Sequence, residues 1–182
     1  MNNSNYKYKR PSERAAGFVL GIFGWIKYIV GSTTTVIPRG YVVQHHGREM
    51  VPGKSLQYQS ILLVEDDANI ANDFIEVIKN YYVCGSIMIL VAHAYDAALT
   101  FFKDEDVDLV IMDADLDDEE GDGATLTREF LSQKPDLVVL ANSSSKISNH
   151  KLAGFGAIET LGKNPEKLKS WLLLHDPAGS DC

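Results

Sequence analysis

Short apolar runs of strand length alternate with helix-periodic segments from residue 61 onward. Because these runs are continuous rather than alternating with polar residues, they are typical of strands buried on both faces of a parallel sheet. Four clear runs and a weaker fifth run cover residues 61–64, 87–91, 109–112, 137–140 and 157–161. The pattern therefore predicts a sheet of five parallel strands.

Helical periodicity fills several of the intervals between these runs. After the first run, five apolar residues share one helix face: Ile70, Phe74, Val77, Ile78 and Tyr81. Further helices are indicated around residues 94–101, 126–131 and 168–172. The repeated β/α alternation predicts an α/β fold with a doubly wound, five-stranded parallel sheet.

The first 59 residues do not follow this alternation and are interpreted as an N-terminal extension. Residues 15–31 are apolar with one charge, and we expect them to form an apolar helix. A membrane span needs about 20 apolar residues, so this helix is short for a transmembrane segment. A short β hairpin is expected within residues 33–58. The α/β domain then covers residues 60–176, and residues 177–182 form a tail.

Charge is distributed unequally between the two parts. Residues 1–60 carry eight basic and two acidic side chains, a net charge of +6, whereas residues 61–182 carry nine and 23, a net charge of −14. Binding to nucleic-acid phosphates requires clustered basic residues, so no direct nucleic-acid binding is expected of the acidic domain. The extension requires a partner: an anionic membrane surface through residues 15–31, a second copy in a homodimer, or the acidic domain itself.

Ligands of open parallel sheets bind beyond the carboxyl ends of the strands, so the residues directly after each apolar run are the candidate site residues. Three such loops bring five carboxylates and one lysine to this edge: Glu65, Asp66, Asp67, Asp113, Asp115 and Lys163. Clustered carboxylates repel one another unless a cation neutralises them, and oxygen ligands select a hard ion such as Mg²⁺. The sequence therefore predicts a magnesium site.

Three segments carry these residues: ILLVEDD, DLVIMDADL and GAIETLGKN. Their content and order resemble the first, third and fifth strand motifs of the receiver domain of two-component response regulators. The resemblance covers Ser60 to His175 and implies the flavodoxin-like receiver fold for the whole α/β domain.

The resemblance implies a role for each residue. Asp113 would accept a phosphoryl group from a histidine kinase or a histidine phosphotransfer protein, and Lys163 would pair with the resulting phosphate. Glu65, Asp66, a carboxylate oxygen of Asp113 and the backbone carbonyl of Asp115 would hold Mg²⁺. The implied protein is a phosphorelay response regulator and not an enzyme. It is expected in the cytoplasm, with membrane association through the extension as a further expectation.

The loop after the third run departs from the family pattern. Asp117 stands where the family usually has proline, and the Asp-Gly pair at 122–123 comes later than usual. The spacing back from this pair makes Asp115 a rival phosphoacceptor, whereas the end of the apolar run favours Asp113. The alternating acids also resemble a calcium loop, although the glycine and glutamate that such a loop requires are missing.

The residues that would transmit phosphorylation also depart from the pattern. The hydroxyl position after the fourth strand falls on Ala141 by its interval from the lysine, or on Asn142 or Ser143 with a small gap. Thr160 stands where the family commonly has an aromatic ring. The alternative function is therefore a pseudo-receiver, a phosphorylation-independent protein-interaction module. A phosphatase of the haloacid-dehalogenase type is a weaker third reading, because its nucleophile lies on the first strand.

Overall fold

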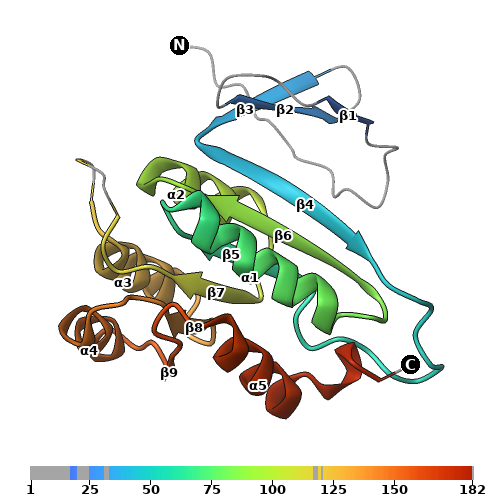
Figure 1. The fold of residues 1–182 in the computed structure, drawn as a ribbon. Coiled ribbons are helices and arrows are strands. Elements are labelled where there is room, and N and C mark those ends of the chain that lie inside the picture. The colour runs from blue at the N-terminus through green and yellow to red at the C-terminus, as the bar shows by residue number, and fades with distance from the viewer. Residues whose placement is uncertain (1–16, 20–24, 31–32, 117–118, 120, 182) are drawn as a thin grey trace.

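The computed structural model describes residues 17–19, 25–30, 33–116, 119 and 121–181. A six-stranded sheet forms the centre of the α/β domain (Figure 1). Its strands, in spatial order, are β4 (Gly40–His46), β6 (Ser86–Ala92), β5 (Ser60–Val64), β7 (Leu109–Met112), β8 (Val138–Ala141) and β9 (Glu159–Thr160). The connections lead in both directions from β5, so the sheet is doubly wound.

The five strands predicted from the apolar runs are all present and run parallel to one another. Every residue of β5 and of β7 is buried, which explains why these strands read as continuous apolar runs. The predicted α/β class and the parallel, doubly wound sheet are confirmed. The fifth parallel strand is shorter than predicted, since β9 contains two residues.

Helices cover both faces of the sheet (Figure 1). In the part of the chain that the structure describes, the α-helices are α1 (Ala68–Tyr81), α2 (Tyr95–Asp104), α3 (Gly123–Gln133), α4 (Lys146–Gly154) and α5 (Pro165–His175). The core residues of α1 and α5 pack on one face of the sheet, and those of α2, α3 and α4 pack on the other. The two apolar layers between helices and sheet bury most of the large side chains.

Helix α1 shows how local sequence sets an element beside the carboxyl edge. Asp67 caps the helix, because its carboxylate accepts hydrogen bonds from the backbone N–H groups of Asn69 and Ile70 at 2.8 and 3.2 Å. Phe74 and Ile78 of the predicted apolar face are fully buried against the sheet. Asp67, the third acidic residue of the ILLVEDD motif, therefore begins α1, whereas Glu65 and Asp66 lie at the end of β5.

Helix α4 was not predicted from the apolar pattern. Of its nine residues only Asn149 and Leu152 are buried, so it has no apolar stripe of helical period. Its start is instead set by Ser145, whose hydroxyl accepts from the Ser148 backbone N–H at 3.2 Å. Polar hydrogen bonds rather than an apolar face therefore define where this helix begins.

The expected helix over residues 15–31 and the expected hairpin within 33–58 are both wrong. Where the structure describes this region it forms strands β1 (Gly17–Val19), β2 (Trp25–Val30) and β3 (Thr33–Pro38) of a separate antiparallel sheet. Glycine is a poor helix former, and the β-branched and aromatic residues between the glycines favour strands. The membrane-surface hypothesis for residues 15–31 loses the helix on which it depended. Among the described residues, no helix combines the length and apolarity of a membrane span.

Strand β4 extends the domain beyond the predicted boundary at residue 60. It pairs antiparallel with all seven residues of β6, from Gly40 opposite Ala92 to His46 opposite Ser86. The strand therefore makes the sheet mixed, with one antiparallel edge strand beside five parallel ones. The segment after β4 continues this role, since Leu56 and Tyr58 belong to the core. The α/β unit thus begins at about Gly40.

A buried carboxylate at the other end of the domain holds this added segment in place. Asp176 is 1% exposed, and its carboxylate accepts from the backbone N–H groups of Gln57 and Tyr58 and from the Tyr82 hydroxyl, at 2.9, 3.1 and 2.9 Å. Its own carbonyl accepts from the Tyr81 hydroxyl at 2.8 Å. The residue joins the segment before β5, the end of α1 and the end of α5.

A chain that begins at Ser60 should be less stable than one that begins at Arg39. It lacks β4 and the buried side chains Leu56 and Tyr58, and each large buried apolar side chain contributes about 1.5–3 kcal/mol. We expect its free energy of unfolding in urea, followed by circular dichroism, to fall by about 5 kcal/mol. Equal unfolding midpoints for the two chains would show that β4 does not belong to the domain.

Asp176→Ala should lower the free energy of unfolding by about 3 kcal/mol, because it leaves buried donors without an acceptor. Tyr82→Phe removes one of these donors together with its need for a partner and should cost only about 1 kcal/mol. Asp136→Ala, at an exposed aspartate, is the matched control. The proposed role of Asp176 fails if Asp176→Ala and Asp136→Ala unfold at the same urea concentration.

Candidate functional site

Three strand ends bring two buried carboxylates and one lysine together at the carboxyl edge of the sheet. Glu65 follows β5 and Asp113 follows β7, and their side chains are 0% and 1% exposed. Lys163, in the loop after β9, donates from Nζ to Glu65 Oε1 and to Asp113 Oδ2, both at 2.8 Å. One ammonium group is thus shared by two carboxylates from different strands.

The lysine is held in position through its backbone. It adopts a positive φ of 54°, and its N–H donates to Asn142 Oδ1 at 3.0 Å. The Asn142 side chain, fully buried, in turn donates from Nδ2 to Glu65 Oε2 at 3.2 Å. Asn142 therefore connects the lysine loop to Glu65, and both oxygens of the Glu65 carboxylate are bonded.

Burial dominates the electrostatics of the pair. It raises the pKa of Glu65 to about 7, although the hydrogen bond from Lys163 acts in the opposite direction and the charge of Asp113 adds to the rise. Burial also raises the pKa of Asp113, against the same lysine hydrogen bond. Burial lowers the pKa of Lys163, but its bonds to Asp113 and Glu65 outweigh this and raise it above the ordinary value. The site therefore favours a charged lysine and weakly acidic carboxylates.

A metal ion can be held by three of these side chains. Glu65, Asp66 and Asp113 each offer one oxygen, and these oxygens lie within 4.8 Å of one another. Oxygen ligands of this kind suit a hard divalent cation such as Mg²⁺. A cation at this point would also relieve the repulsion between the carboxylates, which one lysine offsets only in part. Asp67 caps α1 and is not part of this cluster.

Asp113 and Asp115, the two rival aspartates, have different surroundings. The Asp113 carboxylate faces Lys163, whereas the exposed Asp115 bonds through its carboxylate to Ser143 and Ser148. The two aspartates are joined by a hydrogen bond from the Asp115 backbone N–H to Asp113 Oδ1 at 3.3 Å. The bond to Lys163, which Asp113 shares with the buried Glu65, distinguishes Asp113 as the reactive candidate.

The start of α3 lies against the backbone of Asp113. A Cβ atom built on Gly123 would lie 1.7 Å from the Asp113 carbonyl oxygen, so only glycine allows this approach. The glycine of the Asp-Gly pair thus closes the loop after β7. Asp122 before it caps α3 by accepting from the Thr125 N–H at 2.8 Å. Asp117, which replaces the usual proline, lies outside the described residues.

Ala141, Asn142 and Ser143, the three candidates for the position of the hydroxyl that would transmit phosphorylation, have different contacts. Ala141 is the last residue of β8 and pairs with the half-buried Thr160. Asn142 reaches into the carboxylate pair, and Ser143 donates from its hydroxyl to Asp115 Oδ2 at 3.0 Å. Sequence reasoning missed the role of Asn142 at the lysine and the contact of Ser148 with Asp115, because neither belongs to a motif. Only the meeting of β8, α4 and the β7 loop reveals them.

Comparison with known proteins establishes the family. The family model for the response regulator receiver domain matches residues 61–171, which is more than half of the chain. The chain therefore belongs to this family. The predicted resemblance is confirmed. A search of curated proteins finds no match.

Solved receiver structures share the fold at low sequence identity. The signal receiver domain of a DNA-binding response regulator (merR) from Colwellia psychrerythraea 34H is 20% identical, with a TM-score of 0.55 over 64% of this chain and 97% of that chain. A CheY-like receiver domain protein from Methanospirillum hungatei JF-1 is 17% identical, with a TM-score of 0.52 over 65% and 93%. A response regulator from Burkholderia pseudomallei, solved with a phosphorylated aspartic acid, calcium ion and citrate, is 17% identical, with a TM-score of 0.51 over 64% and 72%.

The free energy of unfolding should depend on pH through Glu65. Its pKa rises on folding from 4.5 to about 7, so the native state binds more protons than the unfolded state in this window. Stability due to this group is therefore lost as the pH increases. In metal-free buffer, Glu65→Gln should gain about 2 kcal/mol relative to the unmodified protein between about pH 5 and about pH 8.

Urea unfolding across this pH range measures the difference, with Glu76→Gln, at an exposed glutamate of α1, as the control. A constant difference between Glu65→Gln and the unmodified protein would show that the Glu65 carboxyl group does not titrate in this window. Adding Mg²⁺ at the upper end should stabilise the unmodified protein more than the variant, since binding to the native state raises its stability.

Proposed function

We propose that this receiver domain acts in phosphorelay signal transduction and accepts a phosphoryl group on Asp113. The observation that supports this most directly is the shared lysine: Lys163 bonds Asp113 Oδ2 and Glu65 Oε1, both at 2.8 Å. A receiver that transfers phosphate needs a carboxylate nucleophile, a cation to stabilise the product and oxygen ligands for a metal. All three occur at one edge of the sheet.

The transfer itself is a displacement at phosphorus. The Asp113 carboxylate attacks the phosphoryl group of a phosphohistidine on a histidine kinase or a histidine phosphotransfer protein. The new O–P bond forms as the P–N bond breaks, and the leaving imidazole nitrogen keeps the bonding electrons and takes up a proton. The product is an acyl phosphate on Asp113. Positioning and charge neutralisation are nearly all that such a transfer requires.

Bound Mg²⁺ would neutralise charge on the phosphoryl oxygens, and Glu65, Asp66 and Asp113 are the side chains that would hold it. The backbone carbonyl of Asp115 is the fourth proposed ligand. Lys163 bonds to Asp113 as a charged group and would pair with a phosphate on that residue. Asn142 orients the system by bonding the lysine backbone and Glu65 at the same time.

Access to the nucleophile requires the surrounding loops to move. Asp113 is 1% exposed, so a phosphoryl donor reaches it only when the loops at the carboxyl edge shift. The partner would therefore bind at this edge. A cytoplasmic location is part of the same proposal. Phosphorylation would then act as a switch, since the new dianion rearranges the same loops.

A small phosphodonor such as acetyl phosphate, supplied with Mg²⁺, should label the protein once, at Asp113. Asp113→Ala should lose all labelling, whereas Asp115→Ala should retain a reduced level because its backbone carbonyl remains. Intact-mass measurement before and after removal of Mg²⁺ with a chelator follows the acyl phosphate. Asp136→Ala, at an exposed aspartate away from the site, is the control and should label fully.

Trapping with beryllofluoride provides a second measurement that does not depend on the lifetime of the acyl phosphate. A protein that binds Mg²⁺ but shows neither labelling nor beryllofluoride binding would be a pseudo-receiver, used as an interaction module. Labelling that survives in Asp113→Ala and disappears in Asp115→Ala would assign the nucleophile to Asp115 instead.

A further inference from the structure

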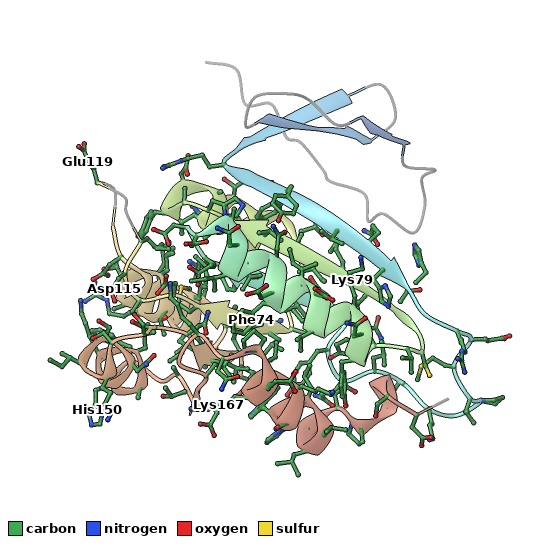
Figure 2. All side chains as sticks on the ribbon, in the orientation of Figure 1. Phe74, Lys79, Asp115, Glu119, His150 and Lys167 are labelled. Atoms are coloured by element: carbon green, nitrogen blue, oxygen red, sulfur yellow. The ribbon has the colours of Figure 1, made fainter. Side chains whose placement is uncertain are left out.

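A cavity of about 860 Å³ lies at the amino edge of the sheet, where β5 and β6 begin. Figure 2 shows Asp115 at one end of the domain and Lys79, in the last turn of α1, toward the other. The cavity lies at this second end, away from the carboxyl edge. Its lining comes from β4, the segment before β5, the start of β6 and residues 103–108. Sites for small molecules commonly have volumes of roughly 300–1,000 Å³.

The floor of this amino-edge cavity is a row of three side chains from three neighbouring strands. Met88 of β6 pairs with Gln44 of β4 on one side and with Ser60 of β5 on the other, and all three line the cavity. Met88 packs against the apolar layer beneath α2, and paired residues of neighbouring strands point to the same face of a sheet. The three side chains therefore lie on the α2 side, beside the end of that helix at Asp104.

Ser60 contributes a buried hydroxyl group that has no partner. The residue is 7% exposed, and its Oγ is the one buried side-chain N or O atom without a hydrogen-bond partner in the part of the chain that the structure describes. Its backbone is fully bonded, since its N–H donates to Asp108 Oδ2 at 3.0 Å and its carbonyl accepts from the Asp108 N–H at 2.9 Å. A buried hydroxyl without a partner costs stability, and a ligand that bonded to it would remove this cost.

The wall of the cavity beside α2 is acidic. Four acidic side chains and one lysine line the cavity, for a net charge of −3: Asp104, Glu105, Asp106, Asp108 and Lys103. Lys134 offsets one of these charges, because its Nζ lies 3.0 Å from Asp106 Oδ1. The remaining charge favours a ligand that is a cation.

The arrangement of the acids favours an organic cation over a metal ion. Among the described residues, three carboxylates come close enough to hold a metal at Glu65, Asp66 and Asp113, and no such group lies along this wall. Neighbouring strands lie about 4.8 Å apart, so the row on the floor is about 10 Å long and has the apolar Met88 at its centre. Ammonium groups joined by methylene chains suit this floor, since the methylenes would contact Met88 and the ammonium groups would bond the polar atoms around it.

The cavity depends on residues outside the part of the chain that the family model matches. That match begins at residue 61, whereas Gln44 and Ser60 come before it. Strand β4 supplies one end of the floor, and the segment before β5 supplies the wall that faces the acids. The added segment therefore completes a binding site as well as the core.

We propose that the amino-edge cavity binds a small organic polycation of the polyamine class. One ammonium group donates to the Ser60 hydroxyl, the methylene chain lies on Met88, and a second ammonium group lies along the acidic wall near Asp104. Binding at this edge is independent of phosphotransfer at Asp113, which lies at the opposite edge of the sheet.

Calorimetric titration of the full chain with spermidine tests this proposal, with excess Mg²⁺ present to saturate the acids of the carboxyl edge. One spermidine should bind per chain. Ser60→Ala should weaken the binding about tenfold, because a hydrogen bond to a charged group is lost. The unfolding temperature of Ser60→Ala without spermidine should not fall, since the hydroxyl that it removes has no partner.

Two charge variants change the affinity in opposite directions. Asp104→Asn should weaken spermidine binding about threefold, and Lys103→Gln should strengthen it by a similar factor, because exposed charges interact weakly. Asp73→Asn, at an exposed aspartate of α1, is the matched control and should bind as the unmodified protein does. In methionine-methyl NMR spectra, spermidine should shift the signal of Met88 and leave that of the buried Met112 in place.

Equal spermidine affinity in Ser60→Ala and the unmodified protein would overturn the proposal. Equal weakening in Asp104→Asn and Asp73→Asn would also overturn it, because the attraction would then be diffuse. A lower unfolding temperature for unliganded Ser60→Ala would show that the hydroxyl already has a partner and would refute its role in binding. A lysine-rich peptide that bound more tightly than spermidine, with the same dependence on Ser60, would replace the small molecule with a protein partner. None of these outcomes depends on the labelling of Asp113.

Discussion

Two carboxylates lie side by side at the carboxyl edge of the sheet, almost without solvent exposure, and they share one ammonium group. Burial and mutual repulsion both oppose this arrangement, and it persists because the strands that carry Glu65 and Asp113 are held adjacent in the sheet by backbone pairing. Lys163 offsets part of the cost. The raised carboxyl pKa values depend on this enforced proximity, and so do the cation binding and the reactivity of Asp113 that we propose.

The domain contains another buried carboxylate that is stabilised by a different means. Asp176 accepts from two backbone N–H groups and one tyrosine hydroxyl, all of them neutral donors fixed by the surrounding fold. Such a group is satisfied and needs no cation. Glu65 and Asp113 instead share one charged lysine side chain, and a metal or a phosphoryl group that arrived there would compete for the same charges. The buried carboxylate at one end of the domain is therefore structural, whereas the two at the carboxyl edge of the sheet are the candidates for chemistry.

The loops at the reactive end are linked by polar side chains rather than by apolar packing. Asn142 connects β8 to Glu65 and Lys163, and Asp115 connects the β7 loop to Ser143 and α4. Hydrogen bonds to charged groups can exchange partners without opening the core, whereas well-packed apolar layers resist displacement. The apolar layers therefore hold the helices of the core in place, while exchangeable polar bonds hold the loops at the reactive end.

The sequence by itself determined the parallel strands, the amphipathic α1 and the meeting of Glu65, Asp66, Asp113 and Lys163, because burial on two faces and the position after a strand are local signals. Helix α4 carries no apolar stripe, so no periodicity could predict it. The apolar run after residue 15 fits either a helix or a strand by its pattern alone. Strand β4 joins the domain through its pairing with β6, which the sequence pattern does not show. The partners of Asn142 and Asp115 lie on other elements, and tertiary structure alone decided those contacts, since hydrogen bonds between distant segments leave no pattern in the chain.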